Sequence, residues 1–130
     1  MNEERLKKVP LFGSLPKKEL KKLAQHADEV QVAAGTRLAT QGDFAYEFFV
    51  IEDGTAEITQ DGKRLDADLG PGDFFGEIGL LESERRTATV TATSPMTLVV
   101  MTGWDFRALE RELPQVSAEV REAIKERMRR

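Results

Sequence analysis

Hydrophobic residues are spaced in different ways along this chain, and each spacing predicts a different kind of element. In residues 1–28, apolar side chains recur at helical spacing with lysines on the other side: Leu20, Leu23, Ala24 and Ala27. Residues 29–102 hold short apolar and β-branched segments between glycine and proline turns, which predicts strands. From Trp104 onward the helical spacing returns, and Pro114 is expected to interrupt that helix.

The strand region is divided by residues that favour tight turns. Asp61-Gly62 supplies the positive φ angles of a two-residue hairpin, and 70–73 and Ser94-Pro95 mark two further turns. Short strands at intervals of about ten residues are typical of a jelly roll or sandwich. We therefore expect a mainly β fold with flanking helices: an eight-stranded jelly-roll (double-stranded β-helix) barrel, interrupted by a short helix that begins at Gly76.

Composition limits the class of protein. A chain of 130 residues is expected to form one domain, with an N-terminal helical segment (1–28), a barrel (29–102) and C-terminal helices (103–130). Its apolar fraction of 40% and charged fraction of 32% are those of a soluble globular protein. The net charge of −4 argues against a nucleic-acid-binding surface, and the absence of cysteine excludes disulfides and thiol chemistry. The sequence shows neither a secretory signal nor a membrane-spanning stretch, so the cytoplasm is the expected compartment.

One segment, 74–92, combines residues suited to binding a phosphorylated ligand. It reads FFGEIGLLESERRTATVTA. A helix opened by Gly76-Glu77-Ile78-Gly79 would offer free backbone amides and a positive dipole end to a phosphate. Arg86 could grip the phosphate oxygens in a fork, and Glu77 is better suited to accept a hydrogen bond from a sugar hydroxyl. Phosphate and hydroxyl recognition within one short segment indicates a nucleotide.

A purely structural interpretation of these residues stays open. Glu77 and Arg86 could form a plain ion pair, and the glycines could be ordinary turn residues. Arg85 is expected to point to the opposite side of an extended chain from Arg86 and to be solvated.

The segment resembles the phosphate-binding cassette of the cyclic nucleotide-binding domains. The family pattern is an apolar residue, Gly, Glu, any residue, a small residue and an apolar residue, then a short spacer and Arg-Ser/Thr/Ala-Ala. It is matched by Phe75-Gly76-Glu77-Ile78-Gly79-Leu80, a spacer over 81–85, and Arg86-Thr87-Ala88 followed by Thr89 to Ala92. A further element of the family precedes it, namely Gly42-Asp43-Phe44, the apolar run 48–51 and Gly54. The resemblance extends from about Val9 to the end of the chain.

The resemblance implies a role for each site residue. Glu77 would accept from the ribose 2′-hydroxyl, and Arg86 would pair with the cyclic phosphate. The remaining positions would surround the ribose and phosphate through backbone amides or, at Thr87, a hydroxyl: Gly76, Ile78, Gly79, Thr87 and Ala88. The implied function is a regulatory domain that binds cAMP or cGMP as a ligand, with no cofactor. We expect cAMP in preference to cGMP, although Thr87 permits either.

The last predicted helix carries an apolar stripe spaced by four residues: Val116, Val120, Ile124 and Met128. Three interpretations are open. The stripe packs on the barrel, or it covers the bound nucleotide as a lid that moves on binding, or it forms a homodimer or contacts an attached effector domain. The lid interpretation makes the domain a switch, which a partner reads through the position of this helix.

Other functions are less consistent with the sequence. The chain is expected not to be an enzyme, because its single histidine, His26, cannot supply the histidine-rich metal site of jelly-roll enzymes, and no cysteine or paired serine is available as a nucleophile. Direct DNA binding is not expected, since no room remains after the terminal helix for a recognition helix. The alternatives are a non-binding jelly-roll module for interaction or dimerisation and, less favoured, a jelly-roll enzyme.

Overall fold

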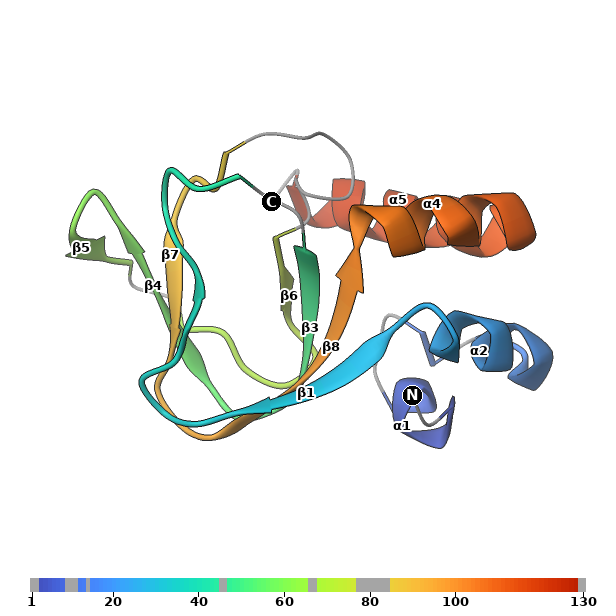
Figure 1. Ribbon diagram of the computed structural model, residues 1–130, viewed down its shortest axis with the longest axis horizontal. Coiled ribbons are helices and arrows are strands. Elements are labelled where there is room, and N and C mark those ends of the chain that lie inside the picture. The colour runs from blue at the N-terminus through green and yellow to red at the C-terminus, as the bar shows by residue number, and fades with distance from the viewer. Residues whose placement is uncertain are drawn as a thin grey trace.

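The described residues form two facing β-sheets, and the described helices pack against one of them (Figure 1). The computed structural model describes residues 3–8, 12–13, 15–44, 47–65, 68–76 and 85–128. The helices are α1 (Glu3–Lys7), α2 (Lys17–Ala24), α4 (Gly103–Glu112) and α5 (Pro114–Met128). The strands are β1 (Asp28–Val32), β2 (Arg37–Ala39), β3 (Glu47–Asp53), β4 (Ala56–Gln60), β5 (Lys63–Arg64), β6 (Phe74–Phe75), β7 (Thr89–Ala92) and β8 (Met96–Thr102).

The strand order is that of a jelly roll. One sheet has the order β1-β8-β3-β6 and the other β2-β7-β4-β5, and every pairing is antiparallel. Apart from the β4–β5 hairpin, neighbours in each sheet come from distant parts of the chain, so the sequence passes repeatedly between the two sheets. The predicted fold is thereby confirmed, with one difference. The described strands form two separate four-stranded sheets rather than one closed barrel. The short helix predicted after Gly76 lies outside the described residues.

Strand β3 shows why both faces of its sheet are buried. Successive side chains of a strand point to opposite faces. Phe48 and Val50 accordingly pack with the helices, whereas Phe49 and Ile51 pack between the sheets. All four are at most 5% exposed, so this strand is apolar without alternation. A strand covered on both faces is expected to have such a composition.

Two hydrophobic cores result from this arrangement. The helix-side core joins Leu6 of α1, Leu23 of α2, Phe106 and Leu109 of α4 and Val116 of α5 to one face of the first sheet. The inter-sheet core fills the space between the two sheets. Its buried members are Ala39, Phe49, Ile51, Ala56, Leu69, Phe75, Val90, Ala92, Met96, Leu98 and Val100.

The predicted turns and helix boundaries lie close to where the sequence places them. Asp61 and Gly62 have φ angles of +53° and +79°, as the β4–β5 hairpin requires. Helix α4 begins with a capping box: the Thr102 hydroxyl accepts from the backbone N–H of Asp105, whose carboxylate accepts from the Thr102 N–H. Pro114 opens α5 rather than continuing α4. No helix in the described part of the chain is long and apolar enough to cross a membrane.

Candidate functional site

A cavity of about 270 Å³ opens into the inter-sheet space beside β6. We call it the cassette cavity. Its lining residues are Ala39, Ile58, Gln60, Leu65, Leu69, Phe74, Phe75, Gly76, Arg86, Thr87, Ala88 and Val90. The structure therefore brings together four of the predicted site residues, namely Gly76, Arg86, Thr87 and Ala88. The other three, Glu77, Ile78 and Gly79, lie outside the described residues.

Gly76 follows directly after β6 and lies against the guanidinium of Arg86. Its φ angle is +79°, a left-handed conformation that glycine adopts without strain. A Cβ atom at this position would overlap Arg86 Nη1 and would lie 2.7 Å from the backbone oxygen of Glu47. Glycine is therefore needed here for its backbone angle and for the space that Arg86 occupies.

Arg86 is held in place by its side chain and its backbone. Its Nη2 donates to the carbonyl of Glu47 at 2.8 Å, and its Cζ lies 5.8 Å from the centre of the Phe49 ring. Its backbone N–H donates to the carbonyl of Asp43 at 2.7 Å, and its own carbonyl accepts from the N–H of Gly42 at 3.0 Å. These contacts join the start of β3 and the 42–44 turn to the segment that carries the guanidinium.

The lining of the cassette cavity combines one charged side chain with polar and aliphatic ones. Of the lining residues, Arg86 alone is charged, while Thr87 and Gln60 contribute a hydroxyl and an amide. Side chains from β2, β4 and β7 and from the 65–69 segment form an aliphatic wall: Ala39, Ile58, Leu65, Leu69 and Val90. A guanidinium beside an apolar wall suits a ligand with an anionic group and a flat apolar part.

A model of the family described as the cyclic nucleotide-binding domain matches residues 29–112, nearly the whole span from β1 to the end of α4. The chain belongs to the cyclic nucleotide-binding domain family. The matched span contains both sheets and the described lining of the cassette cavity, and so the family predicted from 75–92 is confirmed.

Several members of the cyclic nucleotide-binding domain family are similar to this chain. The cAMP-dependent protein kinase regulatory subunit of Schizosaccharomyces pombe is 36% identical over 107 residues, covering 82% of this chain and 26% of that protein. The catabolite activator protein of Thermus thermophilus has a TM-score of 0.81 at 27% identity, over 92% of this chain and 58% of that one. A cAMP-binding acyltransferase from Mycobacterium smegmatis has a TM-score of 0.72 at 30% identity, over 91% and 39% respectively. The chain spans about a quarter of the length of the curated relatives it matches.

The prediction that Arg85 is solvated is correct only in part for this cyclic nucleotide-binding domain. Its side chain is exposed, but Nη1 donates to the carbonyl of Gly42 at 2.7 Å, and Cζ lies 4.3 Å from the centre of the Phe44 ring. Because the backbone of Arg86 forms hydrogen bonds with the 42–44 turn, the side chain of the preceding Arg85 also lies against that turn. Arg85 therefore stabilises this turn through these two contacts, and it does not line the cassette cavity.

His26 links two helices of this domain through a hydrogen bond. Its Nε2 lies 2.8 Å from Oε2 of Glu112, which joins the end of α2 to the end of α4. This hydrogen bond lowers the pKa of the Glu112 carboxyl. No group of three or more metal-ligating side chains occurs among the residues that the structure describes.

Sequence reasoning missed the apolar wall of the cassette cavity. Ile58 and Gln60 occupy alternate positions of β4, so both point to the same face, and that periodicity could have located them. Leu65 follows β5 and is 40% exposed, and Leu69 pairs with Ala56 through an isolated bridge. The carbonyl of Glu47 could not be found from residue types, because any residue at that position offers the same carbonyl.

Proposed function

We propose that this domain binds a 3′,5′-cyclic nucleotide in the cassette cavity, with cAMP preferred to cGMP. The observation that carries the proposal is the guanidinium of Arg86, packed on Gly76 in a cavity that also has an aliphatic wall. One cation beside an aliphatic wall matches a ligand that joins a singly charged cyclic phosphate to a flat base.

In this proposal each part of the ligand has its own partners. The cyclic phosphate pairs with Arg86 and accepts from the Thr87 hydroxyl and from the amides of Gly76 and Ala88. The base lies against the aliphatic wall formed by β2, β4 and β7 and by 65–69. Glu77 binds the ribose 2′-hydroxyl, and Ile78 and Gly79 complete the phosphate site, as the family resemblance implies.

The preference for cAMP is supported by the relatives. The kinase regulatory subunits are named for dependence on cAMP, and the mycobacterial acyltransferase is named as cAMP-binding. The proposed role is regulatory rather than catalytic, which agrees with these kinase subunits. The compartment stays a prediction, and so does the single-domain organisation.

The proposed output is a change in the position of α5. Helices α4 and α5 pack on the helix-side core, and Val116 at the start of α5 is 1% exposed. The side chains of Val120, Ile124 and Met128 lie outside the described part of the helix. Ligand binding would shift α5 only if the nucleotide had different affinities for the two helix positions. An attached effector domain or a second copy would read that shift, and no direct contact with DNA is proposed.

Melting curves with cAMP, cGMP, 5′-AMP and no ligand test the proposal, followed by calorimetry on variants. A ligand at about a hundred times its Kd adds about 2.7 kcal/mol of stability. Arg86→Ala loses charge-assisted hydrogen bonds to a partly buried phosphate, about 3–5 kcal/mol, and should weaken cAMP binding about a hundred- to a thousand-fold. Arg86→Lys keeps the charge without the fork and should be intermediate.

Arg37→Ala, an exposed arginine on β2, is the matched control and should bind cAMP like the unchanged protein. The proposal is wrong if neither cyclic nucleotide raises the melting temperature, or if Arg86→Ala binds cAMP as tightly as Arg37→Ala. A larger effect of cGMP than of cAMP would overturn the preference alone.

A further inference from the structure

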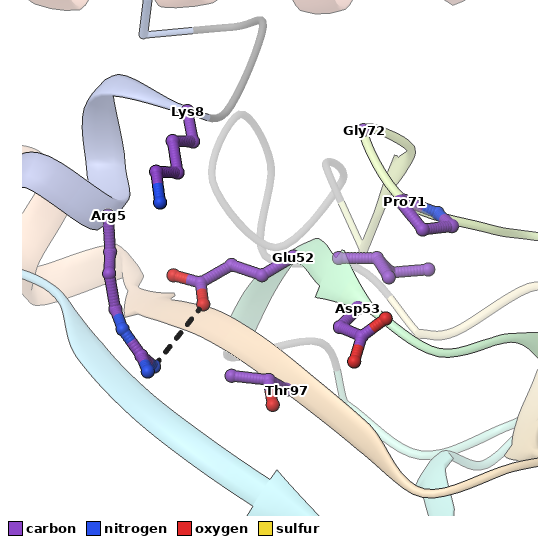
Figure 2. Close-up of a pocket in the computed structure, with 8 residues that line it drawn as sticks. Arg5, Lys8, Glu52, Asp53, Pro71, Gly72 and Thr97 are labelled. Atoms are coloured by element: carbon purple, nitrogen blue, oxygen red, sulfur yellow. Dashed lines mark ion pairs between the residues drawn. The ribbon is translucent and has the colours of Figure 1, made fainter.

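A second and larger cavity, of about 420 Å³, lies between α1 and the far end of β3. We call it the α1 cavity. Its lining residues are Arg5, Lys8, Ile51, Glu52, Asp53, Pro71, Gly72 and Thr97, and none of them lines the cassette cavity (Figure 2). Its volume is within the range of small-molecule sites.

A β-bulge places Glu52 in this cavity. Ile51 pairs with Leu98 and Asp53 with Thr97, so three residues of β3 face two residues of β8 and Glu52 is the extra one. Such bulges redirect a side chain and are frequent beside functional sites. Here the bulge lies under α1, and Figure 2 shows the Glu52 carboxylate directed toward Arg5 and Lys8.

The carboxyl of Glu52 is largely buried and lies close to Arg5 and Glu29. Its side chain is 13% exposed, and Oε2 lies 3.9 Å from Arg5 Nη1, which donates to Glu29 at 2.6 Å. Oε1 is fully buried and accepts no hydrogen bond from the described residues. Burial raises the pKa of Glu52, and the nearby Glu29 carboxylate raises it further.

The charges around the α1 cavity are mixed and lie on separate sides. Arg5 of α1 and Lys8, which directly follows α1, lie on one side, whereas Glu52 and Asp53 belong to β3 (Figure 2). A purely anionic ligand would be repelled by the carboxylates, and a purely cationic ligand by the α1 side chains. A ligand that carries both signs is attracted to both sides.

We propose that the α1 cavity binds a small zwitterion of the free α-amino acid class. Its ammonium is attracted by the carboxylates of Glu52 and Asp53, and its carboxylate pairs with Lys8 and Arg5. The Thr97 hydroxyl is a further polar group in the lining. This site is independent of the proposed nucleotide site, because the two linings share no residue.

The test presents each of the twenty standard amino acids in turn to the nucleotide-free protein in melting curves, with calorimetry on those that raise the melting temperature. At least one should bind with a Kd of about 1 mM or tighter. Trimethylglycine is the matched control ligand, since it keeps both charges but has no N–H donor, and it should bind at least about tenfold more weakly. Acetate and methylammonium, which carry one charge each, should not bind.

Two variants assign the site. Glu52→Gln keeps the shape but loses the charge, and should weaken amino acid binding at least about tenfold. Lys8→Met should weaken it as well, and Glu122→Gln, an exposed carboxylate of α5, should not. Retained cAMP binding by Glu52→Gln shows that this variant is folded. The proposal is overturned if no amino acid binds, if trimethylglycine binds as well as the amino acids do, or if Glu52→Gln leaves binding unchanged.

Discussion

Replacing Gly76 with alanine should weaken nucleotide binding as well as the fold. Two effects act on this variant. Alanine at a φ of +79° costs about 1–2 kcal/mol of backbone strain. The added Cβ also overlaps Arg86 Nη1 and lies 2.7 Å from the Glu47 carbonyl, which belongs to the backbone and cannot rotate away. The guanidinium must therefore move from its position.

The loss of affinity can be estimated from the contact that is broken. A hydrogen bond to a charged group, such as that from Arg86 to Glu47, contributes about 1.5–3 kcal/mol. Moving the guanidinium out of line with the phosphate should cost a similar amount of binding free energy. Gly76→Ala should thus weaken cAMP binding about ten- to a hundred-fold in calorimetry. Its melting temperature without ligand should fall by several degrees, at roughly 3–5 °C for each kcal/mol.

Gly35→Ala is the matched control. Gly35 has a φ of +89° in the β1–β2 turn, and a Cβ there meets nothing within 4 Å. This variant carries the same kind of backbone strain without the steric overlap, so it should lose stability but keep its affinity for cAMP. The reasoning is refuted if Gly76→Ala binds cAMP as tightly as Gly35→Ala does.

Two more predictions concern stability. The folded state raises the pKa of Glu52, so ionised Glu52 opposes folding at neutral pH, and this cost disappears below the ordinary pKa of 4.5. Glu52→Gln should therefore melt higher than the unchanged protein at neutral pH, with the difference closing as the pH falls from neutral towards 4.5; a constant difference across this range would contradict the assignment. Thr102→Ala removes the capping box of α4 and should cost about 0.5–2 kcal/mol in denaturant unfolding, with no change in cAMP affinity. An unchanged unfolding midpoint would show that the cap contributes nothing.

Local chemistry made much of the fold predictable. Asp61-Gly62, Pro114 and the apolar run at 48–51 each have few conformational options, and the structure places a hairpin, a helix start and a doubly buried strand there. Gly76 and Arg86 were identified through the spacing of a family pattern, and the structure brings them into contact.

Features that depend on distant pairing were not predictable. The bulge at Glu52 exists because β3 and β8 lose register, and neither strand alone carries a signal for it. The bond from Arg5 to Glu29 joins residues 24 positions apart on the surface, where many acidic residues were equally available. The jelly-roll barrel was expected from the regular spacing of short strands, whereas that spacing does not determine the hydrogen bonding between the two sheets.

Strand β6 has only two residues, and they point to different cores. Phe74 packs on Phe48 in the helix-side core at a ring separation of 5.6 Å, and Phe75 stacks on Phe49 between the sheets at 4.8 Å. Close-packed interiors transmit small displacements because they hold little empty space. A displacement of Phe75 by a molecule in the cassette cavity would therefore also displace Phe74. The packing between the sheets and the packing beneath the helices would then change together.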